Sequence, residues 1–349
     1  MQEIITSNDS CAVLNELISK GDYDNIFILV DKNTEKHCLP LINKSSLLKN
    51  ARKIIIKAND DNKNIESLSH VWAELCNMGA TRHSLLINLG GGMITDLGGF
   101  AASTFKRGIQ FINIPTTLLA MVDASVGGKT GINFNGFKNE IGVFNSGNAV
   151  ILDTSFLQTL DSPNIRSGYA EMLKHGLISD IQHWSELINF DLSKPDLLSL
   201  GNYIKTSVKI KENIVSSDPF ERGIRKALNF GHTIGHAIES LALQNEKPIL
   251  HGYAVAWGSI CELYLSCTKC NFPTDKMRQT ARFINSYFGP CEITCNDYES
   301  LYDYMTHDKK NTAGQINFTL LGNIGDIRIN QTASRDEIFE ALDFLRDGQ

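Results

Sequence analysis

The stretch Leu85-Leu-Ile-Asn-Leu-Gly-Gly-Gly-Met-Ile-Thr-Asp96 indicates the fold class of this chain. Leu85–Leu89 is a short apolar run of the kind that forms a buried strand, and Met93–Phe105 has the apolar spacing of a helix. The three glycines between them let backbone N–H groups come close to a phosphate, and a helix N-terminus adds partial positive charge. The stretch therefore predicts a βα unit with a tight turn suited to an anion.

The same alternation of apolar runs and helical patterns extends through the first half of the chain. Ile65–Met78 repeats the helical spacing of Met93–Phe105. Repeated βα units form a largely parallel sheet, and open sheets of this kind bind ligands at the carboxyl ends of their strands. The strands expected beside Leu85–Leu89 are Ile26–Val30, Lys53–Lys57, Ile109–Ile114 and Ala149–Leu152.

After about Leu160 the helical pattern dominates. One stretch, Gln315–Leu321, has strand character and is expected to form a hairpin with Ile327–Ile329. We therefore expect an α/β N-terminal domain at residues 1–160 and a mostly α-helical C-terminal domain at 161–349. The helices expected in the second domain are Ile165–Ser179, Leu198–Ile214, Gly223–Leu243, Tyr253–Cys267, Asp275–Phe288 and Asp336–Leu345.

The composition is that of an ordinary soluble globular protein, with 349 residues of which 42% are hydrophobic and 21% charged. The formal net charge of −6 argues against a nucleic-acid-binding protein, which would usually be more basic. No uncharged stretch is long enough for a membrane helix. The start Met-Gln-Glu-Ile-Ile lacks the basic region and apolar run of a secretory signal, so we expect a cytoplasmic protein with reduced thiols.

The eight cysteines include two motifs whose spacing is close to that of a zinc ribbon. Cys267-x-x-Cys270 is followed by Cys291-x-x-x-Cys295. Cys267, however, lies at the end of the apolar helical pattern Ala254–Leu265, where a buried thiol acts as a small hydrophobic side chain. We therefore expect a buried thiol at Cys267 and not a structural zinc site.

Neither glycine-rich loop matches a standard nucleotide-binding fingerprint. The loop at Gly90–Gly92 has a threonine where a dinucleotide fingerprint needs its third glycine, and the acidic strand-end residue Asp31 precedes the loop instead of following it. On spacing alone, a variant dinucleotide site and a plain tight turn both remain open. The stretch Asp123–Thr130 imitates a P-loop but begins with aspartate in place of glycine, which disfavours a kinase or ATPase. Lys129, presented from a glycine turn, still suits an anionic substrate.

The histidines of the second half indicate a metal site. His232 and His236 share one face of a helix, and His251 begins another helical stretch. A catalytic zinc ion needs three nitrogen or oxygen ligands and an open position, and Glu171 could complete such a set with two of the histidines. The remaining histidine would be free for acid–base chemistry. Each histidine alone could be an ordinary core or surface residue, and the missing HExxH glutamate argues against a protease.

Cationic residues accompany these motifs although the net charge is negative. Singly, each is expected to be a solvated surface charge. Together they predict a pocket for a substrate with both a carboxylate and a phosphate, because guanidinium and ammonium groups bind those anions strongly. The residues are Arg107, Lys129, Lys138, Lys174, Lys211, Arg225 and the pair Lys309 and Lys310.

Five motifs, in order along nearly the whole chain, resemble those of the 3-dehydroquinate synthase family. The resemblance runs from about Asp31 to Gly325 and is specific as a set. The motifs are Gly90-Gly-Gly-Met-Ile-Thr-Asp-Leu-Gly-Gly-Phe100, Pro115-Thr-Thr-Leu-Leu119, Ser125-Val-Gly-Gly-Lys-Thr-Gly-Ile-Asn133, Ala170-Glu-Met-Leu-Lys-His-Gly-Leu-Ile178 and Leu228-Asn-Phe-Gly-His-Thr-Ile-Gly-His-Ala-Ile-Glu239.

The resemblance implies an NAD-binding α/β domain, a helical metal-binding domain and an active site between them. The family converts 3-deoxy-D-arabino-heptulosonate 7-phosphate (DAHP) into 3-dehydroquinate and phosphate in the shikimate pathway of aromatic amino acid biosynthesis. Oxidation by NAD makes a ketone that acidifies the adjacent C–H, phosphate leaves, the hydride returns and the opened sugar closes in an aldol step. One zinc or cobalt ion, catalytic NAD, DAHP as substrate and a homodimer are therefore implied.

The resemblance also implies a role for individual residues. By motif, Glu171, His232 and His251 are the metal ligands, and His236 is left to hydrogen-bond and shuttle protons near the substrate. The implied substrate-site residues are Arg107, Asp123, Lys129, Asn139, Lys174, Lys211, Arg225, Asn229 and one of Lys309 and Lys310. The implied NAD contacts are Asp31, Ala58, Asn59, Asp60, Asp61, Asn62, Lys63, Gly92, Met93, Ile94, Thr95, Asp96, Thr116, Thr117, Lys129, Lys138, Phe156, Leu157, Gln158 and Thr159.

Four residues, in three places, depart from the family's pattern. Asn59-Asp60 stands where the family has Gly-Glu, Tyr253 replaces a glutamate after the third metal ligand, and Met121 replaces a common glutamine. None of these changes removes an implied catalytic group. The alternatives are another sugar-phosphate cyclase, a metal-dependent alcohol dehydrogenase that consumes NAD, and a non-enzymatic binding protein, which would leave the ligand set and the cations unexplained.

Overall fold

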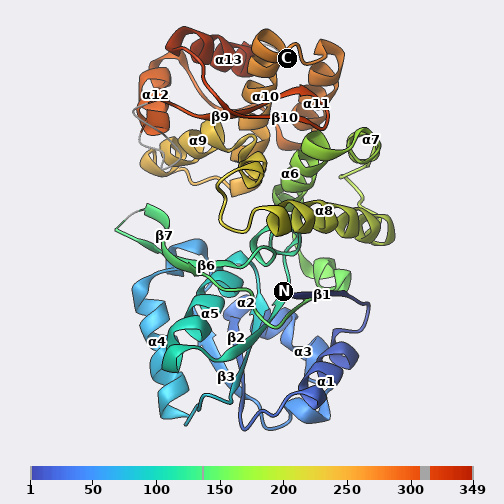
Figure 1. Ribbon diagram of the computed structural model, residues 1–349, viewed down its shortest axis with the longest axis vertical. Coiled ribbons are helices and arrows are strands. Elements are labelled where there is room, and N and C mark those ends of the chain that lie inside the picture. The colour runs from blue at the N-terminus through green and yellow to red at the C-terminus, as the bar shows by residue number, and fades with distance from the viewer. Residues whose placement is uncertain (1, 136, 307–314, 348–349) are drawn as a thin grey trace. The chain divides into compact units, whose positions relative to one another are not determined.

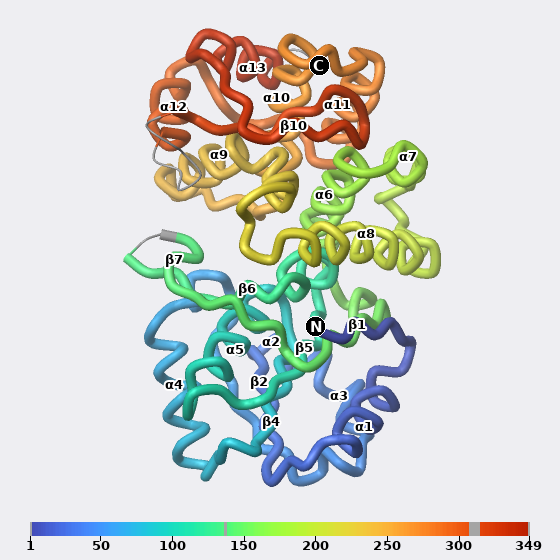
Figure 2. Tube along the Cα trace, in the orientation of Figure 1, coloured from blue at the N-terminus to red at the C-terminus, as the bar shows by residue number. Residues whose placement is uncertain are grey.

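The computed structural model describes residues 2–135, 137–306 and 315–347 (Figure 1). The chain forms two compact units, Met1–Asp161 and Ser162–Gln349. The first unit is an α/β domain and the second is mostly helical. The Cα trace in Figure 2 follows the chain through both units in order, from blue to red.

The first unit is built on a parallel sheet. Its six strands lie in the order β1-β8-β5-β4-β2-β3, and every neighbouring pair is parallel. This confirms the predicted fold class and all five predicted strands. The strands are β1 (Glu3–Thr6), β2 (Ile26–Asp31), β3 (Arg52–Ile56), β4 (Leu85–Gly90), β5 (Gln110–Pro115) and β8 (Ala149–Leu152).

Helices cover both faces of this sheet, which is why its central strands are apolar at successive positions. Phe27 and Leu29 of β2 pack into a core with α4 and α5, while the intervening Ile28 and Val30 are buried as well. In Figure 1, α4 and α5 lie on one side of the strands and α1 and α3 on the other. The helices are α1 (Ser10–Lys20), α2 (Lys32–His37), α3 (Leu39–Ile42), α4 (Ile65–Asn77) and α5 (Gly92–Thr104).

The strand order gives this sheet a switch point between β2 and β4. The chain leaves β2 for β3 on one side, whereas it leaves β4 for β5 on the other. Connections that diverge in this way leave a crevice at the carboxyl ends of the two strands, the usual ligand position in open α/β sheets. Asp31 and the glycines Gly90–Gly92 lie at that edge.

Sequence reasoning missed three strands of the first unit. β1 has only four residues and pairs with β8 from the far end of the domain. The strands β6 (Lys129–Phe134) and β7 (Phe137–Phe144) form an antiparallel hairpin. The sequence of β6 is mixed polar and glycine-containing, so it shows neither the apolar run nor the clean alternation of a strand.

The second unit surrounds one buried helix, α10 (His251–Cys270), against which α6, α9, α11, α13 and β9 pack. Its apolar sequence follows from this central position, and no helix in the described part of the chain is long and apolar enough to span a membrane. The other elements are α6 (Ser162–Ser179), α7 (Ile181–Ile188), α8 (Leu197–Ser217), α9 (His232–Gln244), α11 (Thr274–Phe288), α12 (Tyr298–Thr306), α13 (Arg335–Asp347) and the antiparallel hairpin β9 (Phe318–Asn323) and β10 (Asp326–Gln331). The expected hairpin is confirmed; α7 and α12 were not predicted.

One predicted helix of this unit is wrong in its extent. The expected helix Gly223–Leu243 is two elements, a short 3₁₀ helix η6 (Ile224–Asn229) and α9, separated at Phe230 and Gly231. Gly231 takes a left-handed φ of 78°, which a residue with a Cβ adopts only at a cost. Periodicity alone did not reveal the break because apolar residues continue through it.

Glycines set the spacing of α9 and α10. A Cβ on Gly258 would lie 2.2 Å from the carbonyl oxygen of Gly231, and one on Gly235 would lie 2.9 Å from that of Ala254. Neither approach leaves room for a methyl group, so the two backbones meet directly at this seam. The seam lies beside the first residues of both helices, His232 and His251.

Candidate metal and cofactor sites

Helix α6 buries a carboxylate in the second unit. Glu171 is fully buried, and Lys174, one helical turn later and 1% exposed, forms an ion pair with it. An ionised group almost never lies at such depth without partners, because leaving water costs several kcal/mol. The other groups facing Glu171 therefore determine what this position can do.

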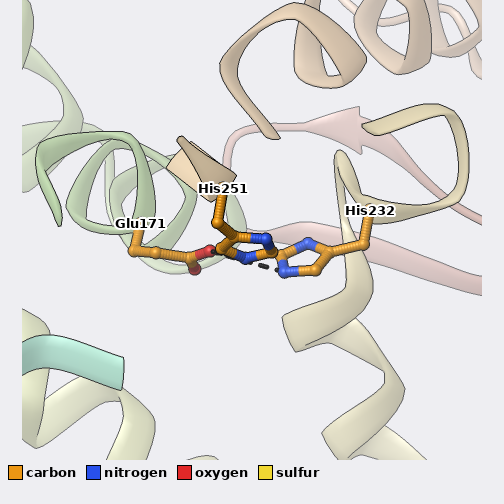
Figure 3. A group of neighbouring side chains, drawn as sticks. All are labelled: Glu171, His232 and His251. Carbon is orange, nitrogen blue, oxygen red and sulfur yellow. Dashed lines mark ion pairs between the residues drawn. The ribbon is translucent and has the colours of Figure 1, made fainter. Parts of the chain in front are cut away.

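Two imidazoles face the Glu171 carboxylate from two different helices (Figure 3). His232 Nε2 lies 3.4 Å and His251 Nε2 lies 3.3 Å from Glu171 Oε1. His232 is the first residue of α9 and His251 the first residue of α10, so the side chains meet where the helices begin. The expected convergence of these three residues is what the structure shows.

The outer nitrogens of both rings are engaged. His232 Nδ1 lies 3.0 Å from the carbonyl oxygen of Phe230, and His251 Nδ1 lies 3.3 Å from Glu239 Oε2. A carbonyl or carboxylate oxygen only accepts, so Nδ1 carries a proton in each ring, and loss of any proton on Nε2 directs a lone pair inward. Within the described residues, Glu171 Oε1 has no hydrogen-bond partner. Three lone pairs converge on one point, a donor set that fits a divalent cation.

Protons compete with a cation for these atoms. Burial would raise the pKa of Glu171, but the charges of Lys174 and His232 hold it well below its usual value. Burial lowers the pKa of His232, against the pull of Glu171. Burial also opposes a charge on His251, yet its contacts with the carboxylates of Glu171 and Glu239 raise its pKa to about 10. A metal ion at this position must therefore displace a proton from His251.

A second group of possible ligands overlaps the first. His236, Glu239 and His251 also place ligand atoms within 4.8 Å of one another. The His236 ring centroid lies 5.3 Å from that of His232 and 5.9 Å from that of His251. Because the contact of Glu239 with His251 is made through Nδ1, the nitrogen that faces away from Glu171, we interpret Glu239 as orienting the ring.

Three of the cationic residues predicted in the second unit are buried. Lys174, Lys211 and Arg225 are at most 6% exposed, although long charged side chains normally reach solvent. Arg225 donates from Nη1 to the carbonyl oxygen of Pro219 at 2.7 Å. Asn229, on the same 3₁₀ helix as Arg225, donates to Glu221 Oε1 at 2.7 Å. Lys309 and Lys310 lie outside the described residues.

Most residues predicted to contact NAD lie at or after the carboxyl ends of parallel strands, whereas Lys129 and Lys138 lie on the antiparallel strands β6 and β7. Asp31 ends β2 and caps α2, accepting from the backbone N–H of Asn33 and Thr34. Of the implied contacts, Ile94, Thr95, Thr116, Phe156 and Leu157 are at most 3% exposed. The segments follow β3 (Ala58, Asn59, Asp60, Asp61, Asn62 and Lys63), β4 (Gly92, Met93, Ile94, Thr95 and Asp96), β5 (Thr116 and Thr117) and β8 (Phe156, Leu157, Gln158 and Thr159).

Lys63 is the centre of a polar cluster at this edge. Its Nζ lies 3.1 Å from Asp96 Oδ2 and donates to Asn139 Oδ1 at 2.6 Å. Burial would lower the pKa of Lys63, but the carboxylates of Asp96 and Asp60 reverse this and raise it. Lys138 pairs with Asp60 at 3.6 Å. The structure thus brings Asn139, implied to bind substrate, beside residues implied to bind NAD.

Three further residues predicted in the first unit, Arg107, Asp123 and Lys129, lie on other elements than Lys63. Asp123 is in a π-helical turn, and Lys129 begins β6 after the left-handed glycines Gly127 and Gly128. Arg107 is exposed, has a positive φ of 70° and lines a surface pocket with Arg82 and Lys106. Strained backbone of this kind is found at functional positions.

The cysteines show no metal-binding arrangement in the part of the chain that the structure describes. No group of close ligand atoms there contains a cysteine. Cys267 and Cys270 lie on α10, where Cys267, expected to be buried, is half-buried because it lies near the end of the helix. Burial raises the pKa of Cys267 and, to about 12, that of Cys291. Thiols with raised pKa values are poor metal ligands and poor nucleophiles.

Substitution of Gly91 tests the glycine loop as a dinucleotide site. A Cβ at this position would lie 3.1 Å from Thr117 Cγ2, so valine is expected to press on Thr117 and to fill the space over the start of α5. We expect Gly91→Val to weaken NAD binding at least tenfold in calorimetry, a loss of about 1.4 kcal/mol. Unchanged zinc content in the second unit would serve as the control for folding. Wild-type NAD affinity would identify the loop as a plain turn.

Glu239 offers a test of ring orientation at the metal site. Glu239→Gln removes the charge that faces His251 Nδ1 while keeping the side-chain shape, and zinc affinity is expected to fall about 10- to 100-fold. Competition with a chromophoric chelator measures that affinity. Glu246→Gln, at an exposed glutamate just after α9, is the matched control and should bind zinc normally. Equal affinities of the two variants would contradict the orienting role.

The sequence of this chain matches a known protein family. The family model described as 3-dehydroquinate synthase N-terminal matches residues 53–167, and the one described as 3-dehydroquinate synthase C-terminal matches residues 168–311. A 3-dehydroquinate synthase from Parabacteroides distasonis is 52% identical over 346 residues, covering 99% of this chain and 98% of the relative.

Solved structures share the fold at lower identity. A 2-epi-5-epi-valiolone synthase from Streptomyces hygroscopicus, with NAD⁺ and Zn²⁺ bound, matches at a TM-score of 0.87 and 23% identity, covering 99% of this chain and 96% of that one. A 2-deoxy-scyllo-inosose synthase, complexed with carbaglucose-6-phosphate, NAD⁺ and Co²⁺, matches at 0.84 and 23%, covering 97% and 95%. Sequence and fold therefore agree along the whole chain, which belongs to the 3-dehydroquinate synthase family.

Proposed function

We propose that this chain converts DAHP into 3-dehydroquinate and phosphate. The observation that carries the proposal is the donor set of Glu171, His232 and His251, built as described in a chain that is 52% identical to a 3-dehydroquinate synthase over its whole length. A plain binding protein would have no need for three converging, desolvated lone pairs beside a buried lysine.

The metal ligands in this proposal are Glu171, His232 and His251, with zinc or cobalt as the ion. One carboxylate and two imidazoles leave room for further oxygen ligands, which is the arrangement of a catalytic centre rather than a structural one. Lys174 keeps Glu171 ionised, and Glu239 holds the ring of His251. Histidine Nε2 and a carboxylate suit either metal, so the donor set does not choose between them.

NAD is proposed to bind at the carboxyl edge of the parallel sheet, across the switch point between β2 and β4. Asp31 would face a ribose, and the N-terminus of α5 at Gly92 would face the pyrophosphate. The ion pair between Lys63 and Asp96 lies at the same edge. The other proposed contacts are Ala58, Asn59, Asp60, Asp61, Asn62, Met93, Ile94, Thr95, Thr116, Thr117, Lys129, Lys138, Phe156, Leu157, Gln158 and Thr159.

The substrate anions are assigned to the buried cations. When bound, NAD would supply reversible hydride transfer, and the metal ion would polarise substrate oxygens. Lys174, Lys211 and Arg225 are already desolvated, so they would hold a carboxylate or phosphate more strongly than surface cations would. The further proposed substrate residues are Arg107, Asp123, Lys129, Asn139 and Asn229.

His236 is proposed to move a proton near the substrate. It is partly exposed, it lies on α9 one turn after His232, and it is left over when Glu171, His232 and His251 hold the metal. An imidazole can accept and return a proton near neutral pH, which fits an acid–base role. A homodimer and a cytoplasmic location complete the proposal, and both rest on the similarity to 3-dehydroquinate synthases.

An assay of the zinc-loaded protein with DAHP and NAD tests this function. We expect phosphate and 3-dehydroquinate to form in equal amounts, with no accumulation of NADH, because the hydride returns to the substrate. Stoichiometric NADH would indicate a dehydrogenase. Inert DAHP, with turnover of another sugar phosphate, would indicate a different cyclase.

A further inference from the structure

A second buried carboxylate, that of Glu262, lies at the N-terminus of α9, next to the proposed metal ligand His232. Glu262 is fully buried on α10, in a helix that is otherwise mostly apolar. Its Oε2 accepts from the backbone N–H of Gly231 at 2.7 Å, and its Oε1 accepts from those of Thr233 and Ile234 at 3.1 and 3.4 Å. Helix α9 has no capping side chain of its own, so Glu262 caps it from the neighbouring helix.

One of these hydrogen bonds reaches a proposed metal ligand through a single peptide group. The N–H of Gly231 and the C=O of Phe230 belong to the same peptide, and that C=O accepts from His232 Nδ1 at 3.0 Å. A carboxylate on the N–H side polarises the peptide, which makes its carbonyl oxygen a stronger acceptor. The stronger acceptor holds the proton on Nδ1 and leaves the Nε2 lone pair directed at Glu171.

We propose that Glu262 is a positioning residue for the metal site, acting on His232 through the peptide between Phe230 and Gly231. The proposal rests on the proposed role of His232 as a metal ligand. In this proposal a carboxylate orients each imidazole of the site. Glu239 contacts His251 directly, and Glu262 acts on His232 across one peptide group.

The charge of Glu262 has a further consequence at this position. His232 and His251 are both the first residues of helices, where the helix dipole places partial positive charge. That charge disfavours a cation close by. An anion bonded to three N–H groups of the α9 N-terminus offsets it, whereas a neutral glutamine would present only one accepting oxygen to donors on both sides.

The test compares Glu262→Gln with a variant destabilised elsewhere. Leu342→Ala removes a fully buried side chain from α13, which also packs on α10, and it should lower the melting temperature of the metal-free protein without touching the α9 N-terminus. We expect zinc affinity to fall about 10- to 100-fold in Glu262→Gln and to stay normal in Leu342→Ala. Labelled-histidine NMR of the metal-free protein should show His232 losing its fixed Nδ1–H form only in Glu262→Gln.

Glu262→Asp is the second variant, in case the glutamine variant does not fold. It keeps the charge on a side chain one methylene shorter, and its zinc affinity is expected between those of the wild type and Glu262→Gln. Normal zinc affinity and an unchanged His232 tautomer in the Glu262 variants would overturn the proposal, as would an equal loss of affinity in Leu342→Ala. Normal zinc binding by His232→Ala would contradict the ligand assignment itself, so the two failures are distinguishable.

Discussion

Replacement of His251 by alanine is expected to leave the purified protein with far less than one equivalent of divalent metal. The side chain supplies one of three atoms that converge on the proposed site, and its Nε2 lies 3.3 Å from Glu171 Oε1. Removal of one of three protein ligands leaves too few for a tightly held ion, and His232→Ala should behave alike. Metal analysis after dialysis gives the stoichiometry, and chelation of the wild type followed by zinc or cobalt should abolish and then restore activity.

His236→Ala is the matched control for the metal prediction. His236 belongs to the overlapping group with Glu239 and His251, so its variant separates that group from the group of Glu171, His232 and His251. We expect full metal content and impaired turnover when His236 is replaced, since this residue is proposed to move protons and not to hold the ion. Full metal content in His251→Ala, or loss of metal in His236→Ala, would contradict the assignment of ligands.

Alanine at Lys174 or at Arg225 is expected to reduce turnover of DAHP on the order of 10²-fold or more, several kcal/mol of transition-state stabilisation. Both side chains are buried, and a cation already out of water interacts strongly with an anion placed beside it. Steady-state phosphate release measures the loss. Arg225→Ala is the cleaner variant, because Lys174 also neutralises Glu171 and its removal would change metal affinity too.

Lys226→Ala provides the control for the substrate prediction. Lys226 lies next to Arg225 on the same 3₁₀ helix, but its ammonium group bonds the side chain of Asn330 at an exposed position. Near-normal turnover is expected from it. If Arg225→Ala retained wild-type turnover with DAHP, the buried arginine would be structural, and the substrate anions would have to be bound elsewhere.

Sequence patterns predicted the parallel sheet and the proposed metal ligands for understandable physical reasons. Strands buried on both faces are mostly apolar, as Leu85–Gly90 is apart from Asn88. A strand followed by glycines and a helix is a pattern that lies within one short stretch of sequence. His232 and His236 are likewise separated by about one helical turn, so their motif is visible in a short stretch of sequence. Such features need no knowledge of what packs against them.

The features that sequence reasoning missed depend on contacts between distant segments. β1 is recognisable only through its pairing with β8. The break before α9 is stabilised by Glu262, 31 residues away from Gly231. One signal for Glu262 was present, because a carboxylate within the apolar pattern Ala254–Leu265 is unusual and points to a buried, partnered charge. Which partner it has could not be inferred before the packing of α9 on α10 was known.

The glycine seam between α9 and α10 limits how this protein can be stabilised by engineering. Replacing a helical glycine by alanine usually gains about 0.4–1 kcal/mol, because the unfolded chain loses freedom. At Gly235 or Gly258 the added methyl would meet backbone atoms at 2.9 and 2.2 Å and force the two helices apart. His232 and His251 would separate with them. A consensus or thermostability library should therefore hold these positions fixed, since a variant could stay folded and still lose the ion.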